Sequence, residues 1–179
     1  GSARRITLGE SSHAEVKKLL TTRLKDQTKW ALVGGPPCQA YSLVGRSRMG
    51  GDPDFEQDER HFLYKEYLKI IADHLPPVFV MENVKGLLSA TVEGVSMITR
   101  IVADLEDPSK ALKGKSDGVT YRLFSLVEQD APGGQVDPRM FIVCAEDYGV
   151  PQARHRMFIV GIRNDLIVRP SLLKRQDGP

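Results

Sequence analysis

The chain has 179 residues, enough for one domain with a buried core or for part of a larger one. Hydrophobic residues make up 41% and charged residues 27%, which excludes disordered and fibrous classes of protein. The net charge of +2 does not by itself indicate a nucleic-acid partner, and no apolar stretch approaches the ~20 residues of a membrane span. The two cysteines are too few for a disulfide framework, so we expect a reducing, cytoplasmic compartment and no membrane partner.

A helix and a buried strand are predicted at the start of the chain. Ser11-Ser12 followed by Glu15 indicates a capping box, and a mostly apolar stripe continues the helix to about Lys25. After a short polar connection, the apolar run Trp30–Val33 predicts a strand that leads into the turn Gly34–Ser42.

This turn places a cysteine in a stiff backbone frame. Two glycines permit a tight turn, and Pro36 and Pro37 fix φ at consecutive positions just before Cys38. An ionised cysteine is a strong nucleophile, and α/β sheets bind ligands at the carboxyl ends of their strands. Cys38 is therefore either a nucleophile or a structural loop cysteine, and this stretch alone does not decide between them.

The next segment predicts a βαβ unit. A loop of about eighteen residues, with Arg46 and Arg48 near its glycine-rich tip, is long enough to suggest a mobile arm that touches an anion. A helical pattern from His61 to Leu75 follows, and Pro76-Pro77 ends it. The apolar run Val78–Met81 then predicts a buried strand parallel to the first one.

A carboxylate stands at the end of this second strand. Because uncompensated burial of a charge is costly, Glu82 indicates either a proton donor at a functional site or a residue that caps a helix or pairs with an arginine. Since the two strands are parallel, Glu82 and Cys38 are expected at the same edge of the sheet.

Four further elements are predicted. The pattern indicates a helix over 92–105, a polar connection over 107–118, a strand over 119–128 and a returning strand over 140–145, followed by a strand over 157–162. Cys144 lies in the returning strand as a small buried hydrophobe, and no zinc-type spacing of cysteine and histidine is visible, so no metal site is predicted. From Arg154 to Arg175 there are six Lys/Arg and one Asp, the local excess best placed to face phosphate.

Three blocks, in this order, resemble the DNA (cytosine-5) methyltransferase family. They are Gly-Gly-Pro-Pro-Cys-Gln-Ala-Tyr-Ser over 34–42, Glu-Asn-Val over 82–84 and Asp-Tyr-Gly-Val-Pro-Gln-Ala-Arg-His-Arg over 147–156. The resemblance implies a Rossmann-like, S-adenosylmethionine-dependent α/β fold. It also implies an enzyme that transfers a methyl group from that cofactor to C5 of cytosine in duplex DNA. Such an enzyme would belong to a modification or restriction-modification system, with a possible cognate endonuclease as a partner. Its expected location is the bacterial cytoplasm, at the nucleoid.

The resemblance also implies roles for individual residues. Cys38 would attack C6 of a flipped-out cytosine, Glu82 would hold N3 and the exocyclic amine, and Arg156 would contact the base carbonyl. Arg154 would lie beside the thiol and a phosphate. The remaining implied residues are the cofactor contacts Pro37 and Leu63, the DNA-facing loop residues Gln39, Ser42, Arg46 and Arg48, and the supporting residues Pro36, Asn83 and Gln152.

The chain departs from the family pattern at both ends. The glycine-rich first block and the acidic residue of the next strand, which hold the cofactor in the family, are not present. We therefore expect the second half of a catalytic domain, with an incomplete cofactor site and little activity of its own. In this scheme residues 3–29 lead in, residues 30–162 carry the motifs, and residues 163–179 begin a missing C-terminal part. A non-catalytic DNA-binding relative of the same fold, or an RNA (tRNA) cytosine-5 methyltransferase, are the alternatives.

Overall fold

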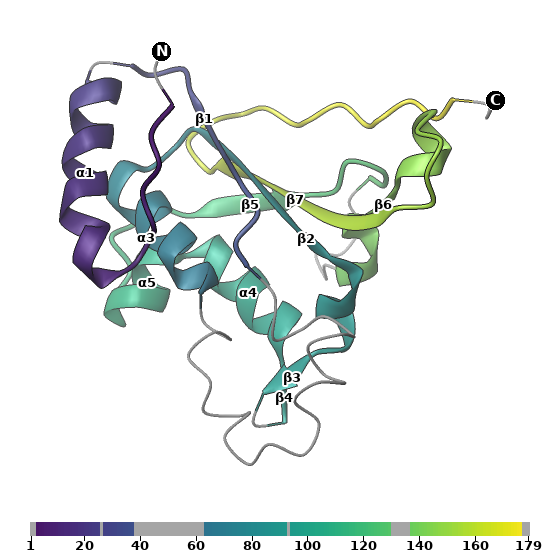
Figure 1. The fold of residues 1–179 in the computed structure, drawn as a ribbon, viewed down its shortest axis with the longest axis horizontal. Helices are drawn as coiled ribbons and strands as arrows, with labels where there is room; N and C mark the ends of the chain where they lie inside the picture. The colour runs from purple at the N-terminus through teal and green to yellow at the C-terminus, as the bar shows by residue number, and fades with distance from the viewer. Residues whose placement is uncertain (1–2, 26, 38–62, 93, 130–136, 177–179) are drawn as a thin grey trace.

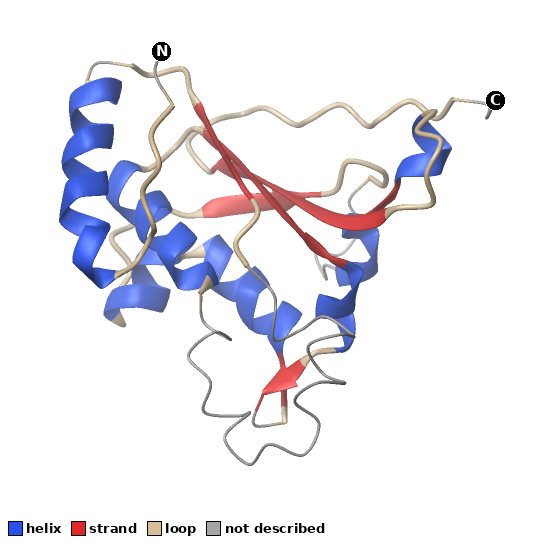
Figure 2. Cartoon of the chain, in the orientation of Figure 1, coloured by secondary structure: helices blue, strands red, loops and turns tan. Residues whose placement is uncertain are grey.

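A central sheet covered by helices organises the chain (Figures 1 and 2). In the computed structural model the sheet order is β1 (Ala31–Gly34), β2 (Val78–Val84), β7 (His155–Arg163) and β5 (Tyr121–Phe124), and β6 (Ile142–Cys144) also pairs with β7. β1 and β2 are parallel, and every pair that includes β7 is antiparallel. The structure describes residues 3–25, 27–37, 63–92, 94–129 and 137–176.

The predicted βαβ unit is confirmed. Helix α3 (Tyr64–His74) connects the two parallel strands and buries Tyr67, Leu68 and Ile71. It ends at Leu75, which has a left-handed backbone (φ 46°), just before Pro76-Pro77. The prolines thus end the helix as the sequence indicates. The described helices include none that is both long and apolar enough to cross a membrane.

One face of the sheet carries the main core. Phe79 and Met81 of β2 and Met157 and Ile159 of β7 point to this face, and each is at most 1% exposed. The helices α3, α4 (Met97–Glu106) and α5 (Pro108–Lys113) lie on the same side (Figure 1). β2 is longer than predicted, because Glu82–Val84 are part of the strand and pair with β7.

The region between 90 and 118 differs from the prediction. The helix predicted over 92–105 begins only at Met97, because β3 (Thr91–Val92) and β4 (Val95–Ser96) form a small two-stranded ribbon, with Gly94 at φ 74° in its turn. The predicted polar connection contains α5. Asp107 caps α5 by accepting from the Lys110 N–H (3.0 Å), and a proline and a left-handed Gly114 mark its two ends.

The first helix also differs from the prediction. α1 (Glu10–Leu24) has Gly9 as its N-cap, and the Ser12 hydroxyl donates to the Gly9 carbonyl (3.1 Å), so the predicted capping box does not form. The helix starts before the Ser-Ser pair, which therefore lies inside its first turn. Only Val16 of its apolar stripe is fully buried, and Lys17 ties α1 to α3 through Asp73 (2.9 Å).

The two strands predicted as a returning pair do not pair with each other. β5 bonds to the second half of β7 and β6 bonds to the first half, so both lie on the same side of β7. The chain after β7 then runs back across the sheet in an extended form (Figure 1). Arg122 donates to the Leu166 carbonyl (2.6 Å) and the Leu173 N–H donates to the Leu126 carbonyl (2.8 Å), which hold this segment in place.

The register between β2 and β7 depends on a glycine. Phe79 stands directly opposite Gly161, and the ring of Phe79 occupies the space that a Cβ at position 161 would need. Phe79 itself is fully buried, with Tyr67 and Tyr121 against its ring at centroid distances of 6.3 and 5.1 Å. The ring therefore has little room to move away.

A methyl group at this position tests how tightly the two strands are held. We expect Gly161→Ala to lower the free energy of unfolding by about 1–3 kcal/mol, the usual cost of overpacking a core. Denaturant titration of the chain measures it. The matched control is Gly9→Ala, because an added Cβ there meets nothing within 4 Å. Phe79→Leu should recover part of the loss when combined with Gly161→Ala, and a Gly161→Ala chain as stable as the original would contradict the packing argument.

Candidate active site

A carboxylate and a guanidinium meet where β2 and β7 pair. Glu82 stands opposite Phe158 and Val84 stands opposite Arg156, so Glu82 and Arg156 are diagonal neighbours on one face of the sheet. Arg156 Nε lies 3.1 Å from Glu82 Oε1. Another nitrogen of the same guanidinium, Nη1, donates to the His155 carbonyl (2.8 Å), which fixes the plane of the group.

The exposure of this pair corrects one expectation. Glu82 was predicted as a buried acid, but its side chain is 37% exposed and that of Arg156 is 26% exposed. The two groups lie on the sheet face opposite the main core, because Phe79, Met81 and Asn83 alternate with them along β2. The carboxylate is therefore compensated by an arginine and is accessible to a ligand.

The turn after β1 lies directly against Glu82. A Cβ on Gly35 would come within 2.9 Å of Glu82 Oε2, so only glycine permits this approach without a shift of the carboxylate. Asn83, which is 4% exposed, donates from Nδ2 to the Pro36 carbonyl (3.4 Å) and accepts from the Val84 N–H (2.8 Å). These contacts tie the Pro-Pro turn to the end of β2.

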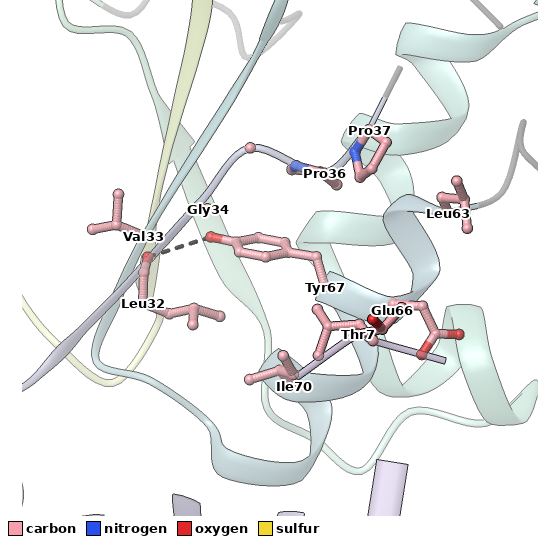
Figure 3. Close-up of a pocket in the computed structure, with 12 residues that line it drawn as sticks. Thr7, Leu32, Val33, Gly34, Pro36, Pro37, Leu63, Glu66, Tyr67 and Ile70 are labelled. Atoms are coloured by element: carbon pink, nitrogen blue, oxygen red, sulfur yellow. Dashed lines mark hydrogen bonds between the residues drawn. The ribbon is translucent and has the colours of Figure 1, made fainter. Parts of the chain in front are cut away.

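A pocket of about 440 Å³ opens on the other side of this turn (Figure 3). It contains both residues that the sequence assigned to the cofactor, Pro37 and Leu63, together with Pro36. Its remaining lining residues are mostly apolar: Thr7, Leu8, Leu32, Val33, Gly34, Gly35, Glu66, Tyr67 and Ile70. Its volume lies in the range of small-molecule sites.

Tyr67 forms a wall of the pocket that the sequence did not single out. Its hydroxyl group lies 3.0 Å from the Val80 carbonyl and 3.3 Å from the Leu32 carbonyl, and so bridges β2 and β1. Burial, with a smaller contribution from Tyr121, raises its pKa well above the usual value, so the hydroxyl remains a hydrogen-bond donor. A Cβ on Gly34 would come within 2.6 Å of the ring. The glycine was a visible signal that a bulky side chain packs there, although its identity was not.

The basic run from Arg154 to Arg175 does not form one surface. Arg154 and Gln152 are exposed, near the start of β7. Arg163 ends the same strand, where it pairs with Asp165 (2.7 Å), and Arg175 lies 3.4 Å from Asp147. The run was predicted as a single phosphate-facing cluster. The structure instead places Arg163 at the far end of the nine-residue strand, whereas the returning chain brings Arg175 back beside Asp147, close to the start of the strand.

The backbone that leads to Arg156 is held by a second carboxylate. The Arg154 N–H donates to Glu146 Oε2 (3.2 Å), and the Ala145 N–H donates to the Arg154 carbonyl (3.0 Å). Cys38, Gln39, Ser42, Arg46 and Arg48 lie outside the described residues, and the roles given to them stay predictions. The structure therefore brings Glu82, Asn83, Arg156 and the Pro36-Pro37 turn together at one sheet edge.

The chain resembles known methyltransferases in sequence. It is 34% identical over 135 residues to the type II methyltransferase M.Bpa9945I of Bacillus paralicheniformis, covering 75% of this chain and 25% of the relative. It is 37% identical over 133 residues to the type II methyltransferase M.AquIA of Picosynechococcus sp., covering 74% and 43%. It is 32% identical over 160 residues to the DNA (cytosine-5-)-methyltransferase M.ApeKI of Aeropyrum pernix, covering 85% and 31%. The chain thus spans less than half the length of each.

The fold has a counterpart among solved structures. A crystal structure described as a DNA modification methyltransferase encoded within an E. coli prophage superposes with a TM-score of 0.50 and 22% identity, covering 86% of this chain and 32% of that one. This supports the methyltransferase type of α/β fold over about a third of that protein. The family model for C-5 cytosine-specific DNA methylases matches residues 5–108 and 135–179. The chain therefore belongs to the C-5 cytosine-specific DNA methylase family.

Proposed function

We propose that the whole protein methylates C5 of cytosine in duplex DNA and that this chain supplies the residues that bind and activate the base. The observation that carries the proposal is the Glu82–Arg156 pair, 3.1 Å apart on an accessible sheet face beside the Pro36-Pro37 turn. The family to which the chain belongs acts on cytosine in DNA. The names of its relatives as type II methyltransferases support a restriction-modification setting, with a cognate endonuclease as a possible partner and the bacterial cytoplasm, at the nucleoid, as its location.

The pair matches the edge of a cytosine. That edge presents an amine donor, the N3 acceptor and the carbonyl acceptor in sequence. A carboxyl group can accept from the amine and donate a proton to N3, while an adjacent guanidinium donates to the carbonyl. Glu82 and Arg156 supply these two kinds of group side by side on one face of the sheet, which supports the proposal. Because these atoms are paired with guanine in a duplex, the base has to be flipped out of the stack to reach them.

The reaction then follows from charge movement in the ring. The thiolate of Cys38 adds to C6, and the resulting negative charge reaches N3, where the Glu82 proton stabilises it. C5 becomes nucleophilic and would take the methyl group from S-adenosylmethionine, with the demethylated cofactor as the leaving group. Loss of the C5 proton to a base and return of the N3 proton to Glu82 restore the double bond and expel the thiolate, so Cys38 and Glu82 are both regenerated. Asn83 would position the turn that carries Cys38, through its bond to the Pro36 carbonyl.

The pocket beside the turn suits part of S-adenosylmethionine, which supplies an electrophilic methyl group when bound. Its lining is largely apolar, as the face of an adenine requires, and it includes Pro37 and Leu63. Glu66, the one carboxylate among the described lining residues, already pairs with Lys69 (2.7 Å). The pocket lies along β1, an edge strand of the described sheet. We propose that the rest of the whole protein completes the cofactor site there.

Two substitutions at the base-binding pair test the proposal. In the whole protein, Glu82→Gln removes the proton donor, and Arg156→Lys removes the second donor nitrogen of the guanidinium. We expect each to reduce the methylation rate by about 10²–10⁴-fold, the usual contribution of a general acid or of an electrostatic contact to the transition state. Transfer of labelled methyl groups from S-adenosylmethionine to cytosine-containing DNA measures the rate. The matched control is Asp137→Asn, which breaks the exposed Asp137–Arg139 pair (2.6 Å) and should leave the rate unchanged.

A trapping experiment separates the enzyme from its alternatives. Duplex DNA with 5-fluorocytosine, together with cofactor, should form a stable covalent adduct with the whole protein and none with Cys38→Ser. An adduct with transfer RNA alone would assign the enzyme to RNA. The absence of any adduct would favour a non-catalytic DNA-binding protein.

The 179-residue chain by itself is expected to have little activity. The reason is that its pocket lies along an edge strand and supplies only part of a cofactor site. Incubation with labelled S-adenosylmethionine and the same DNA gives the measurement. Robust incorporation of methyl groups would show that this chain holds a sufficient cofactor site.

The positioning role of Asn83 has a separate test. Asn83→Asp replaces the amide donor by a carboxylate oxygen. This oxygen would face the Pro36 carbonyl at a buried position. We expect the free energy of unfolding to fall by about 1–3 kcal/mol, the cost of leaving a buried polar group without its partner. Asn164→Asp is the control, because Asn164 also donates through its side-chain amide, to Thr120, but at the surface. Equal stability of the Asn83→Asp and Asn164→Asp chains would contradict this role.

A further inference from the structure

Three potential metal ligands, none of which has a role in the proposed reaction, meet at the start of β7. Cys144 is the last residue of β6 and stands directly opposite His155, the first residue of β7. Glu146 follows Cys144 by two residues. Cys144 Sγ, a Glu146 carboxylate oxygen and a His155 ring nitrogen all lie within 4.8 Å of one another, and all three side chains are half-buried. Strand pairing creates this cluster, which is why no zinc-type spacing was visible in the sequence.

The carboxylate of Glu146 is already oriented. Its Oε1 lies 2.6 Å from His155 Nε2, and its Oε2 accepts from the Arg154 N–H (3.2 Å). One oxygen is therefore fixed by the backbone while the other faces the imidazole and the thiol. Hydrogen bonds that hold a ligand in place in this way are typical of protein metal sites.

Charged groups surround the thiol. Glu146 and Asp147 place two carboxylates near Cys144, and Lys85 and Arg175 place two cations there. A divalent ion held by the three ligands would neutralise the charge of the thiolate and of the Glu146 carboxylate.

We propose that Cys144, Glu146 and His155 bind a divalent ion of the zinc class. Sulfur, nitrogen and carboxylate oxygen are the donors that zinc takes in proteins, at about 2.0–2.3 Å. Tetrahedral ligands at those distances stand about 3.4 Å apart. Glu146 Oε1 and His155 Nε2, now 2.6 Å apart, would therefore have to separate slightly, and Cys144 Sγ, within 4.8 Å of both ligands, would have to move inward. Three protein ligands leave a fourth position for water or another small ligand.

Such an ion would help to hold Arg156 in position. His155 is flanked by Arg154 and Arg156, and the His155 carbonyl accepts from the Arg156 guanidinium (2.8 Å). An ion that joins His155 to β6 would hold the start of β7 and the arginine that follows it. The site would therefore be structural, and it would stabilise the base-binding residue without touching the base.

Cobalt(II) is the probe that reports thiolate ligation directly. The chain with Cys38→Ser keeps Cys144 as its single cysteine. We expect it to bind one equivalent of Co²⁺, with a thiolate-to-metal charge-transfer band and the intense visible bands of a tetrahedral site, and to release it to Zn²⁺. Adding Cys144→Ser should abolish the charge-transfer band. His155→Gln or Glu146→Gln should weaken Zn²⁺ affinity at least tenfold in calorimetry, whereas His13→Gln, a histidine on α1 paired with Asp73 (3.0 Å), should not.

Several results would overturn the proposal. They are the absence of a charge-transfer band in the Cys38→Ser chain, a band that survives Cys144→Ser, or equal affinity of the His155→Gln and His13→Gln chains. Each of these results would show that Glu146 and His155 form an ion pair and that the neighbouring Cys144 thiol does not bind a metal ion. If a further substitution prevents folding, the spectrum of the Cys38→Ser chain still tests whether the site binds metal. A rise in the melting temperature of that chain on addition of Zn²⁺ provides a second test.

Discussion

The pairing of β2 with β7 is the constraint on which the candidate active site depends. It sets Arg156 diagonally across from Glu82, and a slip of one residue would turn one of the two side chains to the opposite face of the sheet. The register is fixed away from the site, where the ring of Phe79 fills the space beside Gly161. β7 also holds β5 and β6, so one strand joins the core, the proposed base-binding pair and the proposed metal ligands.

Two adjacent glycines allow the turn after β1 to serve two functions. Gly34 makes room for the ring of Tyr67, which forms the pocket wall, and Gly35 makes room for the carboxylate of Glu82. A larger residue at either position would separate the turn from one of its neighbours. The prolines that follow stiffen the backbone between the proposed cofactor pocket and the base-binding pair. In the proposed reaction this arrangement would bring the methyl donor and the acceptor ring to opposite sides of a short segment.

The sequence predicted what depends on local pattern. The apolar runs and the proline pairs were enough for β1, α3 and β2. Parallel pairing predicted Glu82 and Cys38 at one sheet edge; Glu82 does lie against the turn that precedes Cys38, while Cys38 lies outside the described residues. The prediction from sequence failed where pairing between strands distant in the chain determines the structure. β5 and β6 were expected to pair with each other, and Cys144 was separated from His155, because nothing local shows that both strands bond to β7. The capping box at Ser11-Ser12 failed since the helix starts earlier, at Glu10.

β1 is an edge strand of the described sheet, which bears on the association of the 179-residue chain by itself. An edge strand offers free N–H and carbonyl groups to any other extended chain, and Val33, 72% exposed, adds an apolar contact. This edge is only four residues long, and it runs into Pro36 and Pro37, which have no N–H to offer. Pro36 and Pro37 thus limit how far an added strand could pair along this edge of the described sheet, and the same dipeptide stiffens the turn of the proposed active site.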